Sequence, residues 1–184
     1  ILAGGVESMS TAPYYLRSVR YGYQAGNGIL LDPNTESQPC SQPRAIYGDL
    51  TMGITAENLA EKYSISREEQ DKFAFESQKK ADQAIRNRVF KNEIVPVPIH
   101  KKKEIVFFDT DEHPRLASLD DLAGLKPVFK MGGTVTAGNS SGRNDGASML
   151  LVSSKEKAEK LGLRPKARIL SQASIGVAPD LMGI

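Results

Sequence analysis

The stretch from Gly132 to Gly146 has the sequence GGTVTAGNSSGRNDG and predicts a loop. It contains five glycines and, apart from Val135, no large apolar side chain. Glycine costs backbone entropy inside a helix or a strand, so neither element would be built from such a stretch. A backbone with few side chains can instead lie close to a ligand, with its N–H groups and short hydroxyls available as donors. We refer to residues 132–146 as the glycine loop.

Two interpretations of the glycine loop remain open on its pattern alone. A connector that turns twice would have the same composition. A binding surface is favoured by the segment directly after the loop, because Ala147–Val152 is a short apolar run typical of a buried strand. Loops held by a rigid scaffold often present binding groups.

Composition sets limits on the class of protein. The 184 residues could form one large domain or parts of two, and 40% hydrophobic and 25% charged residues are typical of a globular protein. The net charge of +2 gives no indication of a nucleic-acid partner. The single cysteine, Cys40, excludes an internal disulfide and indicates a reducing compartment, so we expect a cytoplasmic location. No apolar run approaches the roughly 20 residues that span a membrane.

Both ends of the sequence resemble positions inside a fold. Ile1–Gly5 lacks the basic residues and the length of a signal peptide, and it predicts the end of a buried strand. Leu181–Ile184 ends without a helix cap or a polar tail. We therefore expect an internal piece of a longer protein.

The first third of the chain is expected to be irregular, and helices are expected after it. Residues 14–50 lack sustained periodicity, and Asp32-Pro33-Asn34 is a turn signal. A helix is expected from about Thr55 to Tyr63, and Ser66 with Glu69 forms a capping box for a second helix that ends near Arg88. We expect this second helix to pack through a small or apolar face, Phe73, Ser77, Ala81, Ala84 and Ile85. Its other face is expected to be a solvated surface, Glu68, Asp71, Lys72, Lys79 and Asp82.

Shorter elements are expected in the rest of the chain. Glu93–Ile99 and Ile105–Phe108 predict an edge hairpin whose tip contains Lys101, Lys102 and Lys103. These lysines could protect the edge strand or attract an anionic ligand, and the pattern leaves both open. Ser118 is expected to cap a short helix, and Ser153 with Glu156 is expected to start another. Ala167–Ser174 predicts a strand that opens a further unit.

No catalytic group or metal site is predicted from the residues themselves. Cys40 lies between prolines with no basic partner nearby to activate it, and we expect a structural role. His100 and His113 are expected at the surface, and two histidines with one cysteine cannot form the usual four-ligand zinc site. The acidic run Asp109–Glu112 lacks the spacing of a calcium loop.

Four sequence blocks resemble the thiolase family. Ala3–Ser10 (AGGVESMS) is similar to the strand and turn that follow the nucleophile helix of the family. Met52–Ala60 (MGITAENLA) and Ile65–Asp71 (ISREEQD) resemble two further family segments. The glycine loop is close to a family signature, and the blocks run in family order over essentially the whole chain.

The resemblance implies an α/β fold with the thiolase architecture. It implies that residues 1–13 end the N-terminal core half and that residues 14–143 form an α+β loop domain covering coenzyme A. Residues 144–164 would then be the last strand and helix of that half, a βαβαβ unit, and residues 165–184 would begin the C-terminal half. The acyl-accepting cysteine is expected before Ile1, and the remaining catalytic residues are expected after Ile184, so this segment is expected to contain no catalytic residue. Cys40 matches none of them.

The resemblance also implies seven substrate-binding residues. Ser141 matches the serine that binds the pantetheine arm, with Ala137 and Ser140 beside it. Phe129 matches an aromatic residue near the adenine and pantetheine, and Met52 matches a methionine that shapes the acyl pocket. Arg115 and Asp121 fall near nucleotide-contacting positions, with one residue deleted between Arg115 and Phe129. Thr51 replaces the histidine usual in biosynthetic members, which leaves the acyl chain length open.

The function implied is that of an acyltransferase that condenses two acetyl-CoA molecules to acetoacetyl-CoA or cleaves 3-ketoacyl-CoA with coenzyme A. Coenzyme A and acyl-CoA would be substrates, and no permanently bound cofactor is expected. The whole protein is expected to form a homodimer or homotetramer, and a eukaryotic member would be expected in the mitochondrial matrix or the peroxisome. The alternative is a thiolase-like protein that binds acyl-CoA or lipid without catalysis.

Overall fold

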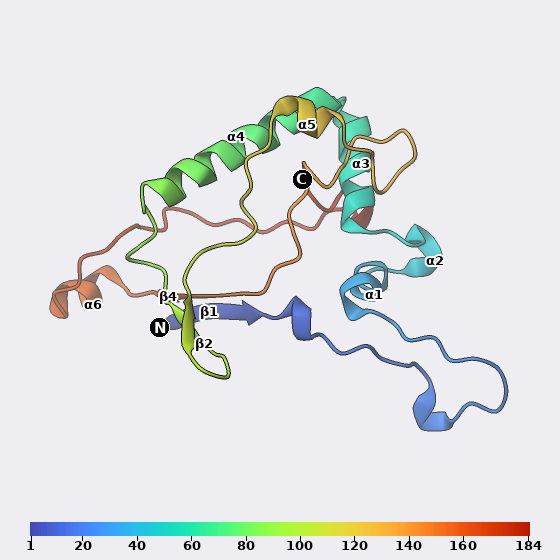
Figure 1. Ribbon diagram of the computed structural model, residues 1–184, viewed down its shortest axis with the longest axis horizontal. Helices are drawn as coiled ribbons and strands as arrows, with labels where there is room; N and C mark the ends of the chain where they lie inside the picture. Colours follow the sequence, from blue (N-terminus) through green and yellow to red (C-terminus); the bar gives the residue numbers. More distant parts are fainter. The chain divides into compact units, whose positions relative to one another are not determined.

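The computed structural model describes residues 1–184 (Figure 1). The chain divides into two compact units. Unit 1 comprises residues 1–50 and 143–182. Unit 2 comprises residues 51–142 and 183–184. The border near residue 142 divides the glycine loop, so its first eleven residues, 132–142, belong to unit 2.

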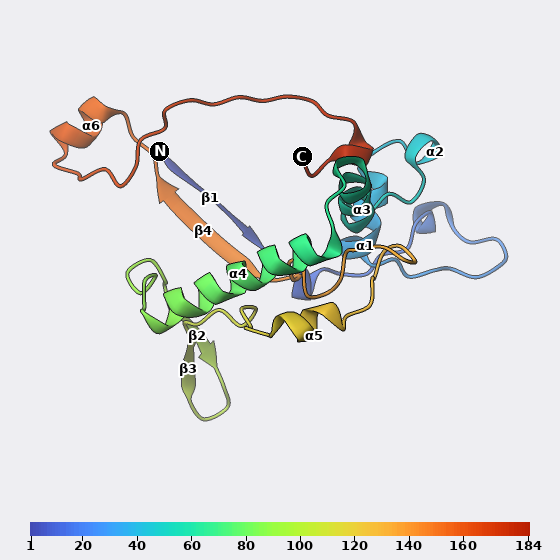
Figure 2. The same cartoon turned by 90° about the horizontal axis from the view of Figure 1, so that it is seen from above.

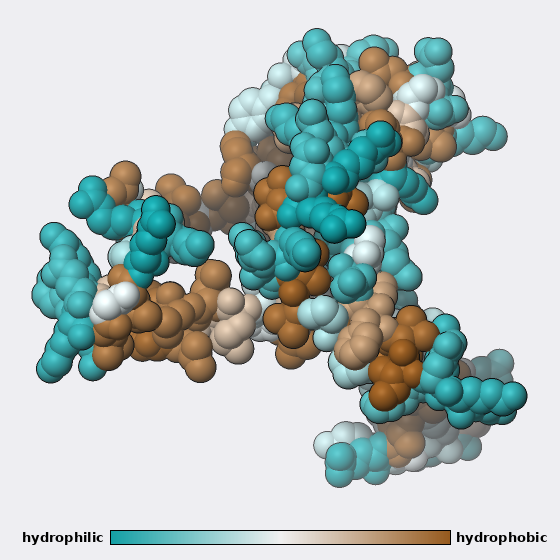
Figure 3. Space-filling view, turned by 60° about the vertical axis from the view of Figure 1, so that its left-hand side comes forward, coloured by the Kyte–Doolittle hydropathy of each residue, from teal (hydrophilic) through white to brown (hydrophobic).

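Unit 1 contains a two-stranded antiparallel sheet. Strand β1 (Leu2–Glu7) pairs with β4 (Gly146–Leu151), with Leu2 opposite Leu151 and Glu7 opposite Gly146 (Figure 2). Both strands were expected from their short apolar runs. Their side chains are exposed on both faces, and Figure 3 shows broad patches of hydrophobic residues at the surface.

A carboxylate joins the chain before β4 to the chain after β1. Asp145 accepts a hydrogen bond from the backbone N–H of Ser10 at 2.9 Å and others from the hydroxyls of Ser8 and Ser10. The hydrogen bonds from Ser10 lower the pKa of the Asp145 carboxyl. The Asn-Asp-Gly end of the glycine loop therefore stabilises the strand pair.

The structure of unit 1 corrects four expectations. Residues 14–50 are not wholly irregular, because they contain α1 (Pro33–Cys40) and α2 (Arg44–Tyr47) besides the 3-10 turn Val19–Tyr21. Asp32-Pro33 starts α1 instead of making a turn, since the Asp32 carboxylate accepts from the N–H of Asn34 at 2.9 Å and proline suits the first helical position.

The other two corrections concern the residues after β4. Helix α6 (Lys155–Lys160) is capped by Ser154, not Ser153, because the Ser154 hydroxyl accepts from the N–H of Lys157. Gly162 follows with a positive φ of 64°, as a helix-ending glycine should. Residues 167–174 form no strand, because no other segment pairs with them and a strand needs the hydrogen bonds of a neighbour. The unit also contains the 3-10 turns Met9–Thr11 and Pro179–Leu181.

Unit 2 contains the long helices. Helix α3 (Met52–Tyr63) begins earlier than expected, because Thr51 is its N-cap and accepts from the N–H of Ile54. Helix α4 (Arg67–Arg86) starts at the predicted Ser66–Glu69 capping box. Helix α5 (Leu119–Ala123), capped by Ser118, lies beside α4 in both views (Figures 1 and 2). The predicted hairpin is present as β2 (Val97–His100) and β3 (Ile105–Phe108), with the lysine tip closed by a bond from Lys101 N–H to the Glu104 carbonyl.

The expected faces of α4 are wrong at four positions. Phe73, expected to pack, is 80% exposed, whereas Asp71, expected in solvent, is only 4% exposed. Ser77 and Ile85, expected to pack, are also exposed. The buried hydrophobic residues of unit 2 are few, namely Ala60, Leu122 and Val135. Polar residues supply the rest of its interior, namely Thr55, Glu57, Asp71 and Thr136. Unit 2 is thus organised around buried hydrogen bonds as much as around apolar packing.

None of the helices is both long enough and apolar enough to cross a bilayer.

Candidate functional site

The first half of the glycine loop is held against α3 by the carboxylate of Glu57. Glu57 is 4% exposed and accepts from the backbone N–H groups of Thr134 at 2.9 Å and Val135 at 2.8 Å. The hydroxyl of Thr134 donates to the same carboxylate at 3.1 Å and accepts from Gln70 on α4 at 2.9 Å. A carboxylate has only acceptor sites, which suits three converging donor groups.

The second half of the loop is held by Asp71 of α4. The Asp71 carboxylate accepts from Arg67 Nε at 2.7 Å and from Asn139 Nδ2 at 2.9 Å. Arg67 also donates to the carbonyls of Leu122 at 2.6 Å and Leu125 at 3.0 Å. The ion pair of Asp71 with Arg67 therefore connects α4 to the glycine loop through Asp71 and to the end of α5 through Arg67.

Asn139 also fixes the turn within the loop. Its Oδ1 accepts from the N–H of Thr136 at 2.8 Å, and its Nδ2 donates to the carbonyl of Thr134 at 3.0 Å. Thr136 is fully buried, and its hydroxyl accepts from the N–H of Gly138 at 3.2 Å. The loop is therefore a defined structure with its own internal hydrogen bonds, as a binding wall requires.

Two glycines of the loop are needed for close approach. A Cβ at Gly133 would overlap the carboxylate of Glu57, and a Cβ at Gly138 would overlap the side chains of Leu122 and Leu125. A side chain at position 133 would force the Glu57 carboxylate or the loop to shift, and one at position 138 would force the ends of the Leu122 and Leu125 side chains or the loop to shift.

Three of the predicted site residues lie on this loop, and they differ in exposure and in hydrogen bonding. The hydroxyl of Ser140 donates to the carbonyl of Thr136 at 2.7 Å, so it is already engaged inside the loop. Ser141 is exposed, and its hydroxyl makes no hydrogen bond within the chain. Ala137 is exposed as well. Ser141 is therefore the loop hydroxyl that is available to a ligand.

Met52 and Phe129 lie at one end of α3. Met52 is the first residue of the helix, and the next residue, Gly53, lies directly against the ring of Phe129, where a Cβ would overlap the ring atoms. Val128, beside Phe129, donates its N–H to the carbonyl of Val135 at 3.0 Å, which joins this segment to the glycine loop. The structure brings Met52 and Phe129 together through Gly53.

Arg115 and Asp121 differ in their availability. The Arg115 side chain is exposed and makes no hydrogen bond or ion pair, while its backbone N–H donates to Gln78 at 2.9 Å. The Asp121 carboxylate accepts from the hydroxyl of Ser118 at 2.6 Å and from its N–H at 3.0 Å, as part of the α5 capping box. These bonds, the hydroxyl first, lower the pKa of Asp121. Asp121 thus has a local structural role, whereas the Arg115 guanidinium is free to meet an anion.

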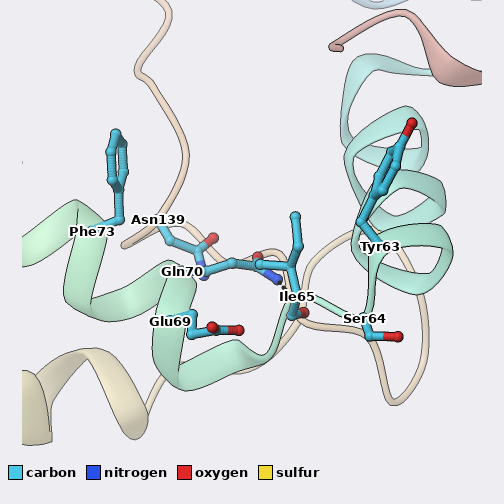
Figure 4. Close-up of a pocket in the computed structure, with 7 residues that line it drawn as sticks. All are labelled: Tyr63, Ser64, Ile65, Glu69, Gln70, Phe73 and Asn139. Atoms are coloured by element: carbon cyan, nitrogen blue, oxygen red, sulfur yellow. Dashed lines mark hydrogen bonds between the residues drawn. The ribbon is translucent and has the colours of Figure 1, made fainter.

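An open pocket of about 470 Å³ lies where α3 turns into α4 (Figure 4). Tyr63 and Phe73 stand on opposite sides of it, with Ile65 and Gln70 between them (Figure 4). Asn139 is the one residue of the glycine loop that lines the pocket. None of the seven predicted site residues lines it, so the pocket and the predicted site are different surfaces.

Cys40, in unit 1, has a basic neighbour that the sequence did not indicate. The guanidinium of Arg17 donates to the Cys40 sulfur at 3.1 Å and pairs with Glu36 at 3.3 Å. The hydrogen bonds from Arg17 to Tyr15 and Cys40 raise the pKa of the guanidinium. The expectation that Cys40 has no basic partner is therefore wrong. Arg17 is 23 residues away in sequence, and only the fold brings it to the cysteine.

The residues that hold the loop were missed from the sequence. Glu57 lies within an otherwise uncharged run of α3, Thr55-Ala56-Glu57-Asn58-Leu59-Ala60, which was a weak signal of burial. Asp71 gave no such signal, because it stands among other charged residues.

Comparison with known proteins gives the family. The sequence profile described as "Thiolase, N-terminal domain" matches residues 1–156. The chain is 48% identical to an acetyl-CoA acetyltransferase of Syntrophomonas wolfei, with all of this chain and 46% of that protein covered. It is 47% identical to a probable acetyl-CoA acyltransferase of Staphylococcus epidermidis over the same shares. The chain spans about half the length of the curated relatives it matches, 46% in both of these cases.

Solved structures agree with the sequence comparison. The acetyl-CoA acetyltransferase of Bacillus anthracis superposes with a TM-score of 0.87 at 45% identity, over 99% of this chain and 45% of that one. The human mitochondrial 3-ketoacyl-CoA thiolase also gives 0.87, at 41% identity and with the same coverage. These matches confirm the expected resemblance and the thiolase-like α/β fold. The chain belongs to the thiolase family, with residues 1–156 corresponding to its N-terminal domain.

Proposed function

We propose that the complete protein is a thiolase-type acyltransferase, which condenses two acetyl-CoA molecules to acetoacetyl-CoA or cleaves 3-ketoacyl-CoA with coenzyme A. Family membership supports the proposal, together with relatives named acetyl-CoA acetyltransferase and 3-ketoacyl-CoA thiolase. In this proposal residues 51–142 contribute to recognition of the acyl-CoA substrate and supply no catalytic residue.

The observation that supports recognition most directly is the state of Ser141. Its hydroxyl is exposed and free on a loop whose neighbouring polar side chains, Thr136, Asn139 and Ser140, are engaged inside the protein. A hydroxyl can donate to an amide carbonyl or accept from an amide N–H, and the pantetheine arm of coenzyme A has both groups. The small side chain of Ala137 leaves space for the arm beside it.

The other predicted residues fit separate parts of the ligand. The exposed guanidinium of Arg115 suits a phosphate group. Phe129 and Met52, adjacent through Gly53, offer partly exposed aromatic and thioether surface for apolar parts of the substrate. Asp121 contributes through the α5 cap that it completes and not through its own charge.

Replacing the free hydroxyl tests the proposal. In the full-length protein, Ser141→Ala should lose one hydrogen bond worth about 1 kcal/mol, and coenzyme A should bind roughly five-fold more weakly in a calorimetric titration. Ser77→Ala is the matched control, because Ser77 is also an exposed serine of unit 2 without a hydrogen-bond partner. Equal affinities of Ser141→Ala and Ser77→Ala would refute a recognition role for the loop.

Turnover separates the enzyme from a binding protein. The full-length protein should cleave acetoacetyl-CoA in the presence of coenzyme A. Tight binding of coenzyme A without turnover in either direction would instead identify a non-catalytic acyl-CoA-binding protein.

A further inference from the structure

We propose that Glu57 is a positioning residue for acyl-CoA recognition: its buried carboxylate fixes the backbone of the glycine loop and thereby places Ser141 and Ala137 for the ligand. This inference rests on the function proposed for the loop. It assigns a role to a buried residue, whereas Ser141 and Ala137, which would meet the substrate, are exposed.

The geometry around Glu57 is specific to a carboxylate. The N–H of Thr134 lies 2.9 Å from both carboxylate oxygens, and the N–H of Val135 lies 2.8 Å from one of them. Every residue except proline has a backbone N–H, so these two donors do not by themselves select a position for the loop. The Glu57 side chain that accepts from them determines where this part of the loop lies. A glutamine at position 57 would direct an NH₂ group at one of these donors, and two donors cannot bond to each other.

Gly133 supports the same conclusion independently. The carboxylate of Glu57 occupies the space in which a Cβ of residue 133 would stand. The loop and the carboxylate are therefore in direct contact on two sides, through the donors of residues 134 and 135 and through the bare backbone of Gly133.

A short series of hydrogen bonds links the residues that Glu57 holds to Ser141. From Val135 the chain enters the turn that Asn139 closes, with bonds to the N–H of Thr136 and to the carbonyl of Thr134. The hydroxyl of Ser140 then donates to the Thr136 carbonyl, which fixes the residue directly before Ser141. A shift at residues 134–135 therefore moves a linked structure whose end is Ser141.

The test is a double-mutant cycle in the full-length protein, with coenzyme A as the titrated ligand. Glu57→Gln should weaken binding roughly tenfold in the wild-type background but only about twofold in the Ser141→Ala background, because a displaced serine and an absent one have similar effects. A merely structural effect of Glu57 would weaken binding by the same factor in both backgrounds. That additive result would overturn the proposal.

Controls distinguish this inference from the proposed function. Glu61→Gln makes the same change one helical turn later, at an exposed carboxylate paired with Lys130, and should leave the affinity for coenzyme A within twofold. If Ser141→Ala has no effect, the recognition role of the loop fails. If Ser141→Ala weakens binding and Glu57→Gln does not, only the positioning role fails.

A second variant covers the case in which Glu57→Gln does not fold. Gly133→Ala keeps the carboxylate but places a methyl group in its space, so it should also weaken binding more in the wild-type background than in Ser141→Ala. Equal factors in both backgrounds would again overturn the proposal.

Discussion

Removing the carboxylate of Asp71 should destabilise the glycine loop strongly. Asp71 is 4% exposed and joins Arg67 of its own helix to Asn139 of the loop. In Asp71→Ala the guanidinium of Arg67, whose side chain is 18% exposed, would lose its carboxylate partner, and Asn139 Nδ2 would lose one of its two acceptors. The substitution thus leaves a largely buried charge uncompensated.

The magnitude depends on that burial. Breaking a buried ion pair by removing one partner costs about 3–5 kcal/mol. Arg67 keeps its bonds to the Leu122 and Leu125 carbonyls, so we take the lower end, about 3 kcal/mol. If Asp71 were on a solvated surface, the loss would be about 0.5 kcal/mol or less. The two cases differ by roughly 2.5 kcal/mol, which is a factor of about 60 in an equilibrium constant.

Amide hydrogen exchange of residues 132–142 in the full-length protein measures this local opening. Asp71→Ala should speed exchange in the loop by about two orders of magnitude under conditions where opening is at equilibrium. Asp82→Ala is the matched control, because Asp82 pairs with Arg86 on the same helix at the same four-residue spacing, with side chains 33% and 75% exposed. Equal exchange in the two variants would refute the structural role assigned to Asp71.

Two further predictions concern packing and capping. Gly53→Ala places a methyl group against the ring of Phe129, and the overlap, about 1–3 kcal/mol, should exceed the roughly 1 kcal/mol that alanine gains in helix propensity. The melting temperature of Gly53→Ala should fall below that of the control Gly176→Ala, whose added methyl would meet nothing within 4 Å. A melting temperature of Gly53→Ala above that of the wild type would contradict the close packing of Gly53 against Phe129. Asp121, whose pKa is lowered from 3.8 by Ser118, should stabilise the protein fully above that pH and lose this contribution as the pH falls through the lower folded-state value. The stability difference between wild type and Asp121→Ala in denaturant should therefore be present at neutral pH and shrink below pH 3.8, and a constant difference would show that the charge of Asp121 is not involved.

The sequence by itself determined the parts of this protein that depend on close neighbours in the chain. The capping boxes of α4 and α5 were predictable because their partners, Ser66 with Glu69 and Ser118 with Asp121, lie three residues apart. The strands β1 and β4 and the hairpin β2–β3 were predictable from short apolar runs. The family was evident from four blocks in order, and so were the matching site positions. Whether those positions bind acyl-CoA stays a prediction.

Only the tertiary structure decided which polar groups hold the candidate site and which are free. Glu57 meets the loop across 77 residues and Asp71 meets Asn139 across 68, and no local pattern reports such pairings. Hydrophobic periodicity predicts which face of a helix avoids water, so a helix that packs through a carboxylate is assigned the wrong face, as α4 was at Asp71 and Phe73. Ser140 and Ser141 are identical neighbours in the sequence, and only the fold gives one a partner and leaves the other free. The physical reason is the same in each case: burial of a polar group is favourable only when distant donors and acceptors converge on it, and that convergence exists only in the folded chain.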